Sequence, residues 1–496
     1  MGASIMGSHR KRITIIGAGL AGISIAKEIR LKGIFGRILA FLDDDPAKIG
    51  KKINGIPILG PIEDVVDLIK PALEDEALMA IPSGTRDQLL RIYGLLRDAG
   101  FSRIRILPGL SQILDGDPHF IQTREVNPED LLARDPVKVS LKESLAYVRG
   151  KRVLVTGAGG SIGSELSRQL LSGGAERLYL FGHGENSIYS IDHELRLLQE
   201  EGVGEKATIV PIIGELQDRD YMFYILQRLR ADVVFHAAAY KHVPLMEANP
   251  VATISNNVFG TKALIDSSVA AEVKQFVMIS TDKAVEPRYV YGASKLIAEE
   301  LVLRERRQGR QYLVVRFGNV LGSRGSILPK FTQQILKGGP VTLTDPAASR
   351  YFMTIPEAVT LVLKVGGLYV DGDLLILDMG KPVLIRELAE QLIHFHGYLP
   401  DKDVKIVYTG LRPGEKLTEK LWADQEHPEP TGYDRILKVE KATVLNGELD
   451  DALERLRVIC SPDENSRKAY RNRRQLRRVL HDLIPSIEVP ENEPEY

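Results

Sequence analysis

The sequence predicts an α/β protein built from two doubly wound domains with parallel sheets. Two glycine-rich turns, RITIIGAGLAG from Arg12 and RVLVTGAGGSIG from Arg152, each follow an apolar strand and precede a helical pattern. After each turn, strand-like apolar runs alternate regularly with helix-like segments. This alternation indicates a parallel sheet with helices on both faces.

The first turn opens a small domain, expected over 11–114. A strand over 13–16 precedes the glycines, and a second strand ends at an aspartate about twenty residues after the last of them. This spacing is the dinucleotide-type fingerprint, in which the acid holds a ribose hydroxyl. The glycines either bind a nucleotide or merely pack a helix against the sheet, and the sequence leaves both open. The residues of this candidate site are Gly17, Gly19, Gly22 and Asp43.

The second turn opens a larger domain, expected over 151–318, and predicts a phosphate-binding loop. Small residues let the backbone approach a pyrophosphate, and the N-terminus of the following helix favours its negative charge; a tight turn without a ligand is the alternative. Gly182 stands where an NAD-selective acid is expected, so His183 either faces a 2′-phosphate or lies in a solvated loop. NAD versus NADP therefore stays open. The candidate cofactor residues are Gly157, Gly160, Ser161, Ile162, Gly163, His183, Glu215, Ala237, Ala238, Tyr291 and Lys295.

The run STDKAVEPRYVYGASK carries the candidate catalytic residues. Tyr291 and Lys295 stand four positions apart, which places them on one face of a helix. A nearby ammonium favours the phenolate, and the pair can take a proton from a sugar hydroxyl while hydride leaves the same carbon. Thr281 adds a hydroxyl to this run. Asp282 and Lys283 form either an additional acid–base pair, which simple alcohol oxidation does not need, or a surface ion pair.

Composition argues against several other classes of protein. The 65 Lys and Arg residues balance 66 Asp and Glu residues, so the net charge of −1 gives no argument for nucleic-acid binding. A single cysteine, Cys460, excludes an internal disulfide framework and fits a reducing cytoplasm. No run approaches the roughly 18 apolar residues of a membrane helix. The histidines have no second ligand cluster to form a metal site, and His236 is expected in the core or bonded to the backbone.

Eight motifs together resemble the extended short-chain dehydrogenase/reductase family. They are TGAGGSIGSE, AAAYKHVPLME, NNVFGTK, STDKAV, YGASK, RFGNVLGSRGS, RYFMTIPEA and GLRPGEK. More narrowly, residues 12–440 are similar to the large, CapD-like bacterial polysaccharide-biosynthesis group that contains nucleotide-sugar 4,6-dehydratases. The resemblance implies two Rossmann-type domains, the second with a smaller C-terminal substrate-binding subdomain, and a tightly bound, recycled NAD or NADP. It also implies a UDP-N-acetylhexosamine substrate (UDP-N-acetylglucosamine is expected), a homo-oligomer and a cytoplasmic location at the inner face of the membrane.

The resemblance also implies a reaction. Tyr291, helped by Lys295, would remove the proton from a C4 hydroxyl held by Thr281, while hydride passes to the nicotinamide. Lys283, if partly neutral, would take the C5 proton, and Asp282, if protonated, would assist departure of the C6 hydroxyl as water. Hydride return to C6 would leave a 4-keto-6-deoxy sugar. The alternatives are a nucleotide-sugar 4-epimerase, which has no task for the Asp–Lys pair, and a non-catalytic nucleotide-sensing scaffold.

Later motifs supply the expected substrate contacts. Arginine side chains in these motifs suit a sugar-nucleotide diphosphate because a guanidinium can clamp phosphate oxygens; a structural salt bridge is the alternative for each. Asn257 is expected to bond the backbone near the active site or to cap a helix. The candidate substrate residues are Lys241, Asn257, Asn319, Arg324, Arg350, Arg412 and Glu415.

Six segments are expected along the chain. They are an expression scar over 1–10, the first domain over 11–114, a connector over 115–150, an NAD(P)-binding catalytic domain over 151–318, a substrate-binding region over 319–440 that partly returns to the catalytic core, and a charged segment over 441–496. We expect the last fifteen or so residues to be frayed. Large members of the group carry transmembrane helices before the first domain, so either a membrane anchor precedes this chain in its native form or the chain is a soluble relative. Many of them carry Met where this chain has Tyr291.

Overall fold

The structure is a computed structural model. It describes residues 11–32, 36–107, 124–126, 145–204, 206–306, 309–368, 374–412, 414–440, 445, 449–461 and 469–493. The chain divides into two compact units, Met1–Ser140 and Leu141–Tyr496. The expected expression scar and most of the expected connector lie outside the described residues.

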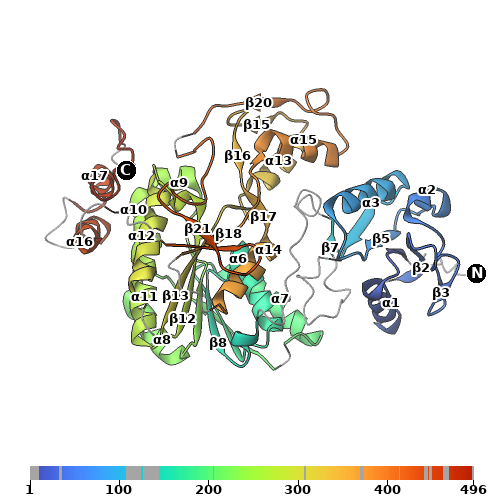
Figure 1. The fold of residues 1–496 in the computed structure, drawn as a ribbon, viewed down its shortest axis with the longest axis horizontal. Coiled ribbons are helices and arrows are strands. Elements are labelled where there is room, and N and C mark those ends of the chain that lie inside the picture. Colours follow the sequence, from blue (N-terminus) through green and yellow to red (C-terminus); the bar gives the residue numbers. More distant parts are fainter. Residues whose placement is uncertain are drawn as a thin grey trace, which may run out of the picture. The chain divides into compact units, whose positions relative to one another are not determined.

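The first unit contains a largely parallel sheet with the strand order β2-β1-β5-β6-β7 (Figure 1). Every pair is parallel except β6 with β7. Its elements are β1 (Arg12–Ile16), α1 (Leu20–Lys32), β2 (Arg37–Leu42), β3 (Lys52–Ile53), β4 (Ile56–Pro57), the 3₁₀ helix η1 (Ile62–Asp64), α2 (Val65–Leu68), β5 (Glu76–Met79), α3 (Arg86–Asp98), β6 (Arg103–Ile106) and β7 (Arg124–Glu125).

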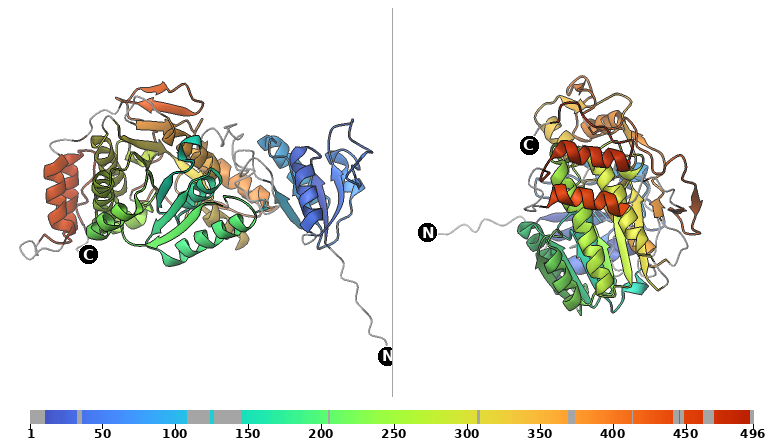
Figure 2. Two further views of the ribbon diagram at one scale, coloured as in Figure 1. Left: turned by 90° about the horizontal axis from the view of Figure 1, so that it is seen from below. Right: turned by 90° about the vertical axis from the view of Figure 1, so that its left-hand side faces the viewer.

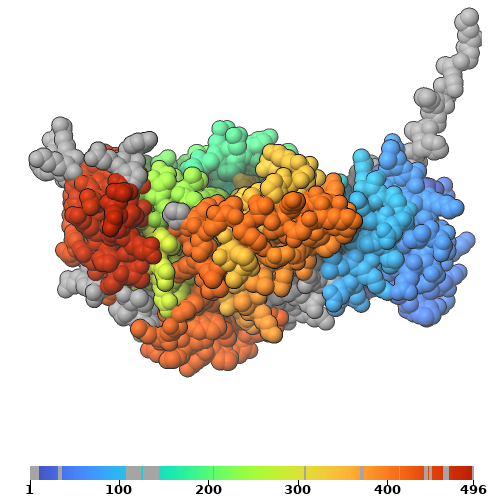
Figure 3. Space-filling model, turned by 90° about the horizontal axis from the view of Figure 1, so that it is seen from above, coloured from blue at the N-terminus to red at the C-terminus, as the bar shows by residue number. Residues whose placement is uncertain are grey.

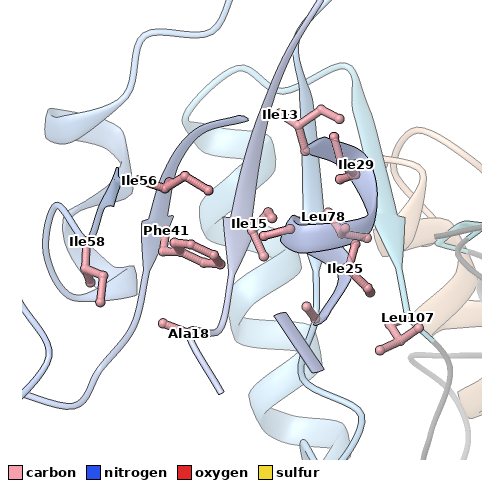
Figure 4. Packing of buried hydrophobic residues seen from close by; sticks show 12 residues of the cluster. Ile13, Ile15, Ala18, Ile25, Ile29, Phe41, Ile56, Ile58, Leu78 and Leu107 are labelled. Carbon is pink, nitrogen blue, oxygen red and sulfur yellow. The ribbon is translucent and has the colours of Figure 1, made fainter. Parts of the chain in front are cut away.

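Apolar side chains fill both faces of this sheet. Ile13, Ile15 and Phe41 from the strands pack against Ile25 and Ile29 from α1 (Figure 4). The alternate strand residues pack on the opposite face against side chains from α3. Strands buried on both faces carry mostly apolar residues, and in β1 the side chains of Ile13, Ile15 and Ile16 are buried together with that of Thr14.

The second unit contains a nine-stranded sheet with the order β10-β9-β8-β11-β12-β13-β18-β22-β21. The strands from β10 to β18 run parallel, and β22 and β21 are antiparallel additions. The elements up to β13 are η5 (Ala146–Val148), β8 (Arg152–Thr156), α6 (Ser161–Ser172), β9 (Arg177–Gly182), α7 (Glu185–Glu200), β10 (Thr208–Ile213), α8 (Arg219–Leu229), β11 (Val233–His236), α9 (Val243–Ala248), α10 (Pro250–Ile254), the π-helix η6 (Ser255–Gly260), α11 (Thr261–Ala270), β12 (Gln275–Thr281), the 3₁₀ helix η7 (Asp282–Ala284), α12 (Val290–Arg304) and β13 (Gln311–Phe317).

Helices cover both faces of this sheet, so the predicted α/β fold with parallel sheets is confirmed. Helices α8, α11 and α12 pack side by side, and α14 packs against α6 on the other face (Figure 1). The remaining elements are β14 (Asn319–Leu321), α13 (Ile327–Leu336), β15 (Val341–Leu343), β16 (Ser349–Arg350), β17 (Phe352–Thr354), α14 (Ile355–Gly366), β18 (Leu374–Leu377), β19 (Val383–Leu384), α15 (Ile385–Phe395), β20 (Ile406–Tyr408), β21 (Pro428–Pro430), β22 (Ile436–Val439), α16 (Leu449–Cys460) and α17 (Arg473–Leu483). No helix among the described residues is long and apolar enough to cross a membrane.

The C-terminal segment packs on the rest of the second unit, so the expectation that the last fifteen or so residues fray is wrong for residues up to 493. Helices α16 and α17 lie side by side against the α10–α12 side of the sheet (Figure 2). Beyond α17, Ser486 donates a hydrogen bond to the carbonyl of Pro287. The Glu493 side chain is buried in ion pairs. The high charge of this segment suggested a solvated tail, but Arg473 and Arg477 form ion pairs with Glu493, and Arg477 also pairs with Glu247.

Candidate active site

A cavity of about 980 Å³ lies where the carboxyl ends of β11, β12 and β13 meet the segment after residue 318. In open α/β sheets this end of the strands is where ligands bind. The candidate residues that line the cavity are Ile162, Ala237, Lys241, Thr281, Lys283, Tyr291, Lys295, Asn319, Arg350, Arg412 and Glu415. The fold therefore brings the catalytic run and most of the later motifs to one site.

Asp282 and Lys283 form an ion pair at this cavity: Asp282 is completely buried, and Lys283, whose side chain is 23% exposed, lines the cavity. The Asp282 side chain is completely buried, and Lys283 Nζ lies 2.9 Å from its Oδ1. Thr281 Oγ1 donates to the same oxygen at 2.9 Å, and Lys283 Nζ also donates to Asn319 Oδ1 at 3.1 Å. Asp282 Oδ2 is buried without a hydrogen-bond partner among the described residues. A Cβ on Gly318 would lie 2.9 Å from this oxygen, so Oδ2 faces the backbone of that glycine, and Asp282 itself does not line the cavity.

The charge of Lys283 differs from the expectation. Burial lowers the pKa of Lys283, but the carboxylates of Asp282 and Glu419 outweigh burial and hold that pKa above its ordinary value. The side chain is therefore an ammonium at neutral pH, whereas proton removal from C5 requires an amine. The neighbours that were expected to keep Lys283 partly neutral do the opposite.

Tyr291 and Lys295 stand on α12, as their spacing predicts. Burial raises the pKa of Tyr291 to about 12, while the Lys283 ammonium and a hydrogen bond with Thr281 oppose this rise. Burial lowers the pKa of Lys295 to about 8, and Lys295 Nζ donates to the carbonyl of Ile279 at 2.8 Å. The ammonium that most favours the phenolate is therefore Lys283, and not Lys295 as the motif suggested.

The second glycine turn has the geometry of a phosphate cradle. Gly157 has φ +68°, and a Cβ there would lie 2.7 Å from the backbone of Ala238. A Cβ on Gly163 would lie 2.1 Å from the carbonyl oxygen of Gly157, so this glycine lets α6 approach the strand. Gly160 at the N-cap of α6 has no side chain to bond the first-turn amides. Those amides and the helix dipole fit the pyrophosphate of NAD or NADP.

Three other predicted residues do not line the cavity. The Arg324 guanidinium donates to the carbonyl of Gly159 at 2.9 Å, and its backbone N–H donates to Ser161 Oγ at 3.0 Å. Arg324 therefore ties the later loop to the glycine turn, although it was predicted to bind the substrate. His183 meets the ring of Tyr240 edge to face, with centroids 6.4 Å apart. Glu215 is exposed in the turn after β10.

Asn257 bonds the backbone of the residue before Lys241, and Lys241 lines the cavity. Asn257 lies in the π-helix η6 and bonds both the N–H and the carbonyl of Tyr240, each at 2.9 Å. It also donates to Ser294 Oγ on α12 at 3.0 Å. The amide therefore holds the backbone beside Lys241. Burial and the Lys283 charge lower the pKa of Lys241.

The later arginines approach the cavity from the substrate-binding region. Arg350 donates to the carbonyls of Lys416 at 2.7 Å and Leu417 at 2.9 Å. Arg412 pairs with Glu415 at 2.5 Å, and its side chain remains half exposed. Each arginine therefore makes structural contacts within the protein, as the salt-bridge alternative predicted for Arg412. Both residues also line the cavity.

Glu419 is a cavity residue that the sequence reasoning missed. Its side chain is 4% exposed, and its carboxylate lies 3.9 Å from Lys283 Nζ and 3.8 Å from Lys416 Nζ. Burial raises the pKa of Glu419, and the charge of Lys283 opposes that rise. The only sequence signal was an acid four residues after Glu415, because nothing local indicates the approach to Lys283.

The acid of the first glycine turn is engaged within its own unit. Asp43 Oδ2 accepts from the N–H of Ala18 at 2.7 Å, Oδ1 accepts from the N–H of Asp45 at 3.0 Å, and Lys48 Nζ lies 3.2 Å from both oxygens. A Cβ on Gly22 would lie 2.0 Å from the carbonyl oxygen of Gly17, whereas Gly19 has open space around it. These contacts fit the packing alternative, and a nucleotide site in this unit stays a prediction.

His236 lies in the core, where its ring bonds two threonines. Nδ1 lies 2.7 Å from Thr156 Oγ1, and Nε2 lies 2.9 Å from Thr261 Oγ1. Burial lowers the pKa of His236 to about 3, so the ring is neutral. Within the described ranges, no group of three or more His, Cys, Asp or Glu side chains is placed to hold a metal ion.

Comparison with known proteins identifies the family. Residues 153–441 match the family model described as "Polysaccharide biosynthesis protein". The chain belongs to this family. The resemblance that the motifs indicated is thereby confirmed.

Relatives of this polysaccharide biosynthesis protein include nucleotide-sugar enzymes. The probable polysaccharide biosynthesis protein EpsC of Bacillus subtilis is 44% identical over 412 residues, which cover 83% of this chain and 68% of the relative. The inverting UDP-N-acetylglucosamine 4,6-dehydratase of Campylobacter jejuni is 31% identical, and the UDP-glucose 4-epimerase of Rickettsia conorii is 32% identical; each match covers 56% of this chain and 79% of the relative. The X-ray structure of Pen from Bacillus thuringiensis has a TM-score of 0.51 and 33% identity, over 56% of this chain and 84% of that one. These likenesses support a nucleotide-sugar modifying enzyme in polysaccharide biosynthesis.

Proposed function

We propose that the protein is a nucleotide-sugar 4,6-dehydratase that converts UDP-N-acetylglucosamine to a 4-keto-6-deoxy sugar nucleotide. The observation that carries this proposal is the Asp282–Lys283 pair, in which the completely buried Asp282 bonds a lysine that lines the same cavity as Tyr291. An epimerase acts only at C4 and needs no acid and base for C5 and C6. Relatives with both names exist, so the Asp282–Lys283 pair supports dehydration over epimerisation, and product analysis distinguishes the two.

The glycine turn at Gly157–Gly163 and the adjacent Ala238 backbone would hold NAD or NADP. When bound, this cofactor would accept hydride from C4 and later return it to C6. Tyr291 takes the proton of the C4 hydroxyl as a phenolate; burial raises the pKa of Tyr291 to about 12, and the Lys283 ammonium opposes that rise. Thr281 is hydrogen-bonded to Tyr291 and therefore lies within reach of the same substrate oxygen.

One proton transfer prepares the elimination. In the resting pair, Lys283 is an ammonium and its Nζ donates to Asp282 Oδ1 at 2.9 Å. Movement of that proton along the hydrogen bond yields an amine on Lys283 and a carboxylic acid on Asp282. This transfer is a step of the reaction and not the resting state, because the carboxylates of Asp282 and Glu419 hold the pKa of Lys283 above its ordinary value.

The same pair then completes the loss of water. The Lys283 amine takes the C5 proton, which the C4 ketone has made acidic, and Asp282 gives its proton to the departing C6 hydroxyl. The substrate loses one proton and one hydroxide as water, while Lys283 and Asp282 return to ammonium and carboxylate. The proton that Asp282 gives up is the one its Oδ1 received from Lys283, so this proposal assigns the acid step to Oδ1 and the base step to Lys283 Nζ.

Product analysis tests the proposal. The protein incubated with UDP-N-acetylglucosamine is expected to yield a product that has lost one water and carries a C6 methyl group, seen by mass spectrometry and NMR. Unchanged mass with inversion at C4 would replace dehydration by epimerisation.

Two variants test the acid–base pair. Lys283→Ala and Asp282→Asn should each slow dehydration by about 10²–10⁴-fold, the usual contribution of a general acid or base. Asp282→Asn should still oxidise C4 in a single turnover, followed by the absorbance of reduced cofactor, whereas Lys283→Ala should do so more slowly because it loses the ammonium that favours the Tyr291 phenolate. The exposed Lys337→Ala on the substrate-binding region is the matched control. Undiminished dehydration by Lys283→Ala would remove its role as the C5 base.

A further inference from the structure

The C-terminal segment contacts the loop that connects Lys283 to Tyr291. Helices α16 and α17 lie directly against the catalytic unit in the space-filling view (Figure 3). The chain after α17 then reaches the loop over 285–290, which connects Lys283 to Tyr291. Ser486 Oγ donates to the carbonyl of Pro287 at 2.7 Å, and the N–H of Glu488 donates to the carbonyl of Arg288 at 3.0 Å.

The helix that carries Tyr291 is capped by a side chain from another helix. Tyr289 is the N-cap residue of α12 and makes no side-chain capping bond. The carboxylate of Glu247 on α9 instead accepts from the N–H of Val290, the first residue of α12, at 2.7 Å. A carboxylate at this position satisfies an otherwise free amide and interacts favourably with the helix dipole. Glu247 therefore fixes the backbone one residue before Tyr291.

Two arginines of α17 hold Glu247 in place. Arg477 Nη1 lies 2.9 Å from Glu247 Oε2, and Arg477 Nη2 donates to the carbonyl of Glu247 at 3.0 Å. Glu493 lies 2.6 Å from Arg477 Nε and 2.8 Å from Arg473 Nε. The side chains of Arg477 and Glu493 are 4% and 2% exposed, so water cannot easily replace these contacts.

We propose that residues 473–493 are a positioning element of the active site, acting through Arg477 and Glu247 on the N-terminus of α12. The network sets where Tyr291 stands relative to Asp282 and Lys283. A shift of about 1 Å in a catalytic group can cost about 10²-fold in rate. This inference rests on the proposed function, but only on its first step, in which Tyr291 acts at C4. Dehydration and epimerisation share that step.

Variants of the full chain test the proposal. Arg477→Met removes the charge and keeps most of the apolar side chain, and Glu493→Gln is the milder change. Arg474→Met and Glu491→Gln are matched controls, because both residues are exposed in the same segment. For Arg477→Met we expect kcat to fall about 10- to 100-fold with KM changed less than about 3-fold. The isotope effect of C4-deuterated substrate should rise, Arg477→Lys should restore part of kcat, and both controls should match the wild type.

Hydrogen exchange supplies a readout that needs no substrate. Amides over 285–295 should exchange at least about 10-fold faster in Arg477→Met and Glu493→Gln than in the controls, because the capping bond to Val290 is loosened. Unchanged exchange together with unchanged kcat in folded variants would overturn the positioning role. A wild-type product that is not dehydrated would overturn the proposed function alone, since C4 oxidation and exchange still report on Tyr291 and its helix.

Discussion

Arg316 on β13 is the cation of a buried triad beside the active site. Its side chain is 1% exposed; Nη2 lies 2.8 Å from Glu299 Oε2, and Nη1 lies 2.9 Å from Glu426 Oε2. Nη1 also donates to the carbonyl of Leu421 at 3.3 Å. Glu299 comes from α12, so the triad joins the catalytic helix to the segment that returns to the sheet. We predict that Arg316→Met destabilises the second unit strongly.

The size of the expected loss in unfolding free energy depends on Glu299 and Glu426, which stay buried after Arg316 is replaced. Removal of one partner from a buried ion pair costs about 3–5 kcal/mol, because the other charge is left desolvated without compensation. Arg316→Met leaves both Glu299 and Glu426 buried, so we expect a loss of about 5 kcal/mol in the free energy of unfolding. Arg304→Met is the control, because the Arg304 and Asp450 side chains are 45% and 71% exposed. That control should lose at most about 1 kcal/mol.

The single tryptophan reports on this triad. Trp422 lies between Leu421, whose carbonyl accepts from Arg316, and Ala423, whose N–H donates to Glu426 Oε2 at 2.9 Å. Urea unfolding followed by its fluorescence should therefore register the loss directly, with circular dichroism as a second probe. The triple variant Arg316→Met, Glu299→Gln, Glu426→Gln should recover part of the stability. A loss below about 1 kcal/mol for Arg316→Met would refute the reasoning that these charges are desolvated.

Two further predictions concern single positions. Gly22→Ala should destabilise the first unit by at least about 1–3 kcal/mol in urea unfolding, because the new Cβ would lie 2.0 Å from the carbonyl oxygen of Gly17; Gly19→Ala, with open space, should not. Equal effects of the two changes would contradict the packing role. For Lys295 the pKa is lowered from 10.5 to about 8 on folding, so the unfolded chain alone holds this proton between those values. The unfolding free energy of the wild type should therefore rise between about pH 8 and about pH 10 relative to Lys295→Met; a constant difference would exclude that titration.

The glycine turns and the Tyr–Lys pair were readable from sequence because they depend on residues close together in the chain. A strand, a glycine turn and a helix follow one another directly at Gly157 and at Gly17. Tyr291 and Lys295 share a face of one helix by their spacing alone. The motifs of the second unit, which run from the glycine turn at Thr156 to Glu415, also predicted the family, because each is a continuous stretch of sequence.

Electrostatic details were not readable, because each depends on charges from distant parts of the chain. The motif allowed a partly neutral Lys283, but Glu419 approaches it from the far end of the unit and helps to hold it charged. Asp43 has the spacing of a ribose-binding acid, yet the fold turns it onto the N–H of Ala18 and the side chain of Lys48. Arg324 likewise reaches the glycine turn through a loop whose path no local pattern indicates.

By itself, the sequence determined the α/β fold class, the family, and which residue types could move a proton. Tertiary structure decided whether Asp282 and Lys283 face solvent or a closed site, which ammonium acts on Tyr291, and what holds the helix that carries it. The physical reason is that hydrophobic periodicity and helix spacing are local, whereas pKa values and buried ion pairs depend on desolvation and on charges brought within about 4 Å by the whole fold. The charged C-terminal segment shows this most directly, since only packing turned its arginines from an apparent surface tail into contacts that hold the active-site helix.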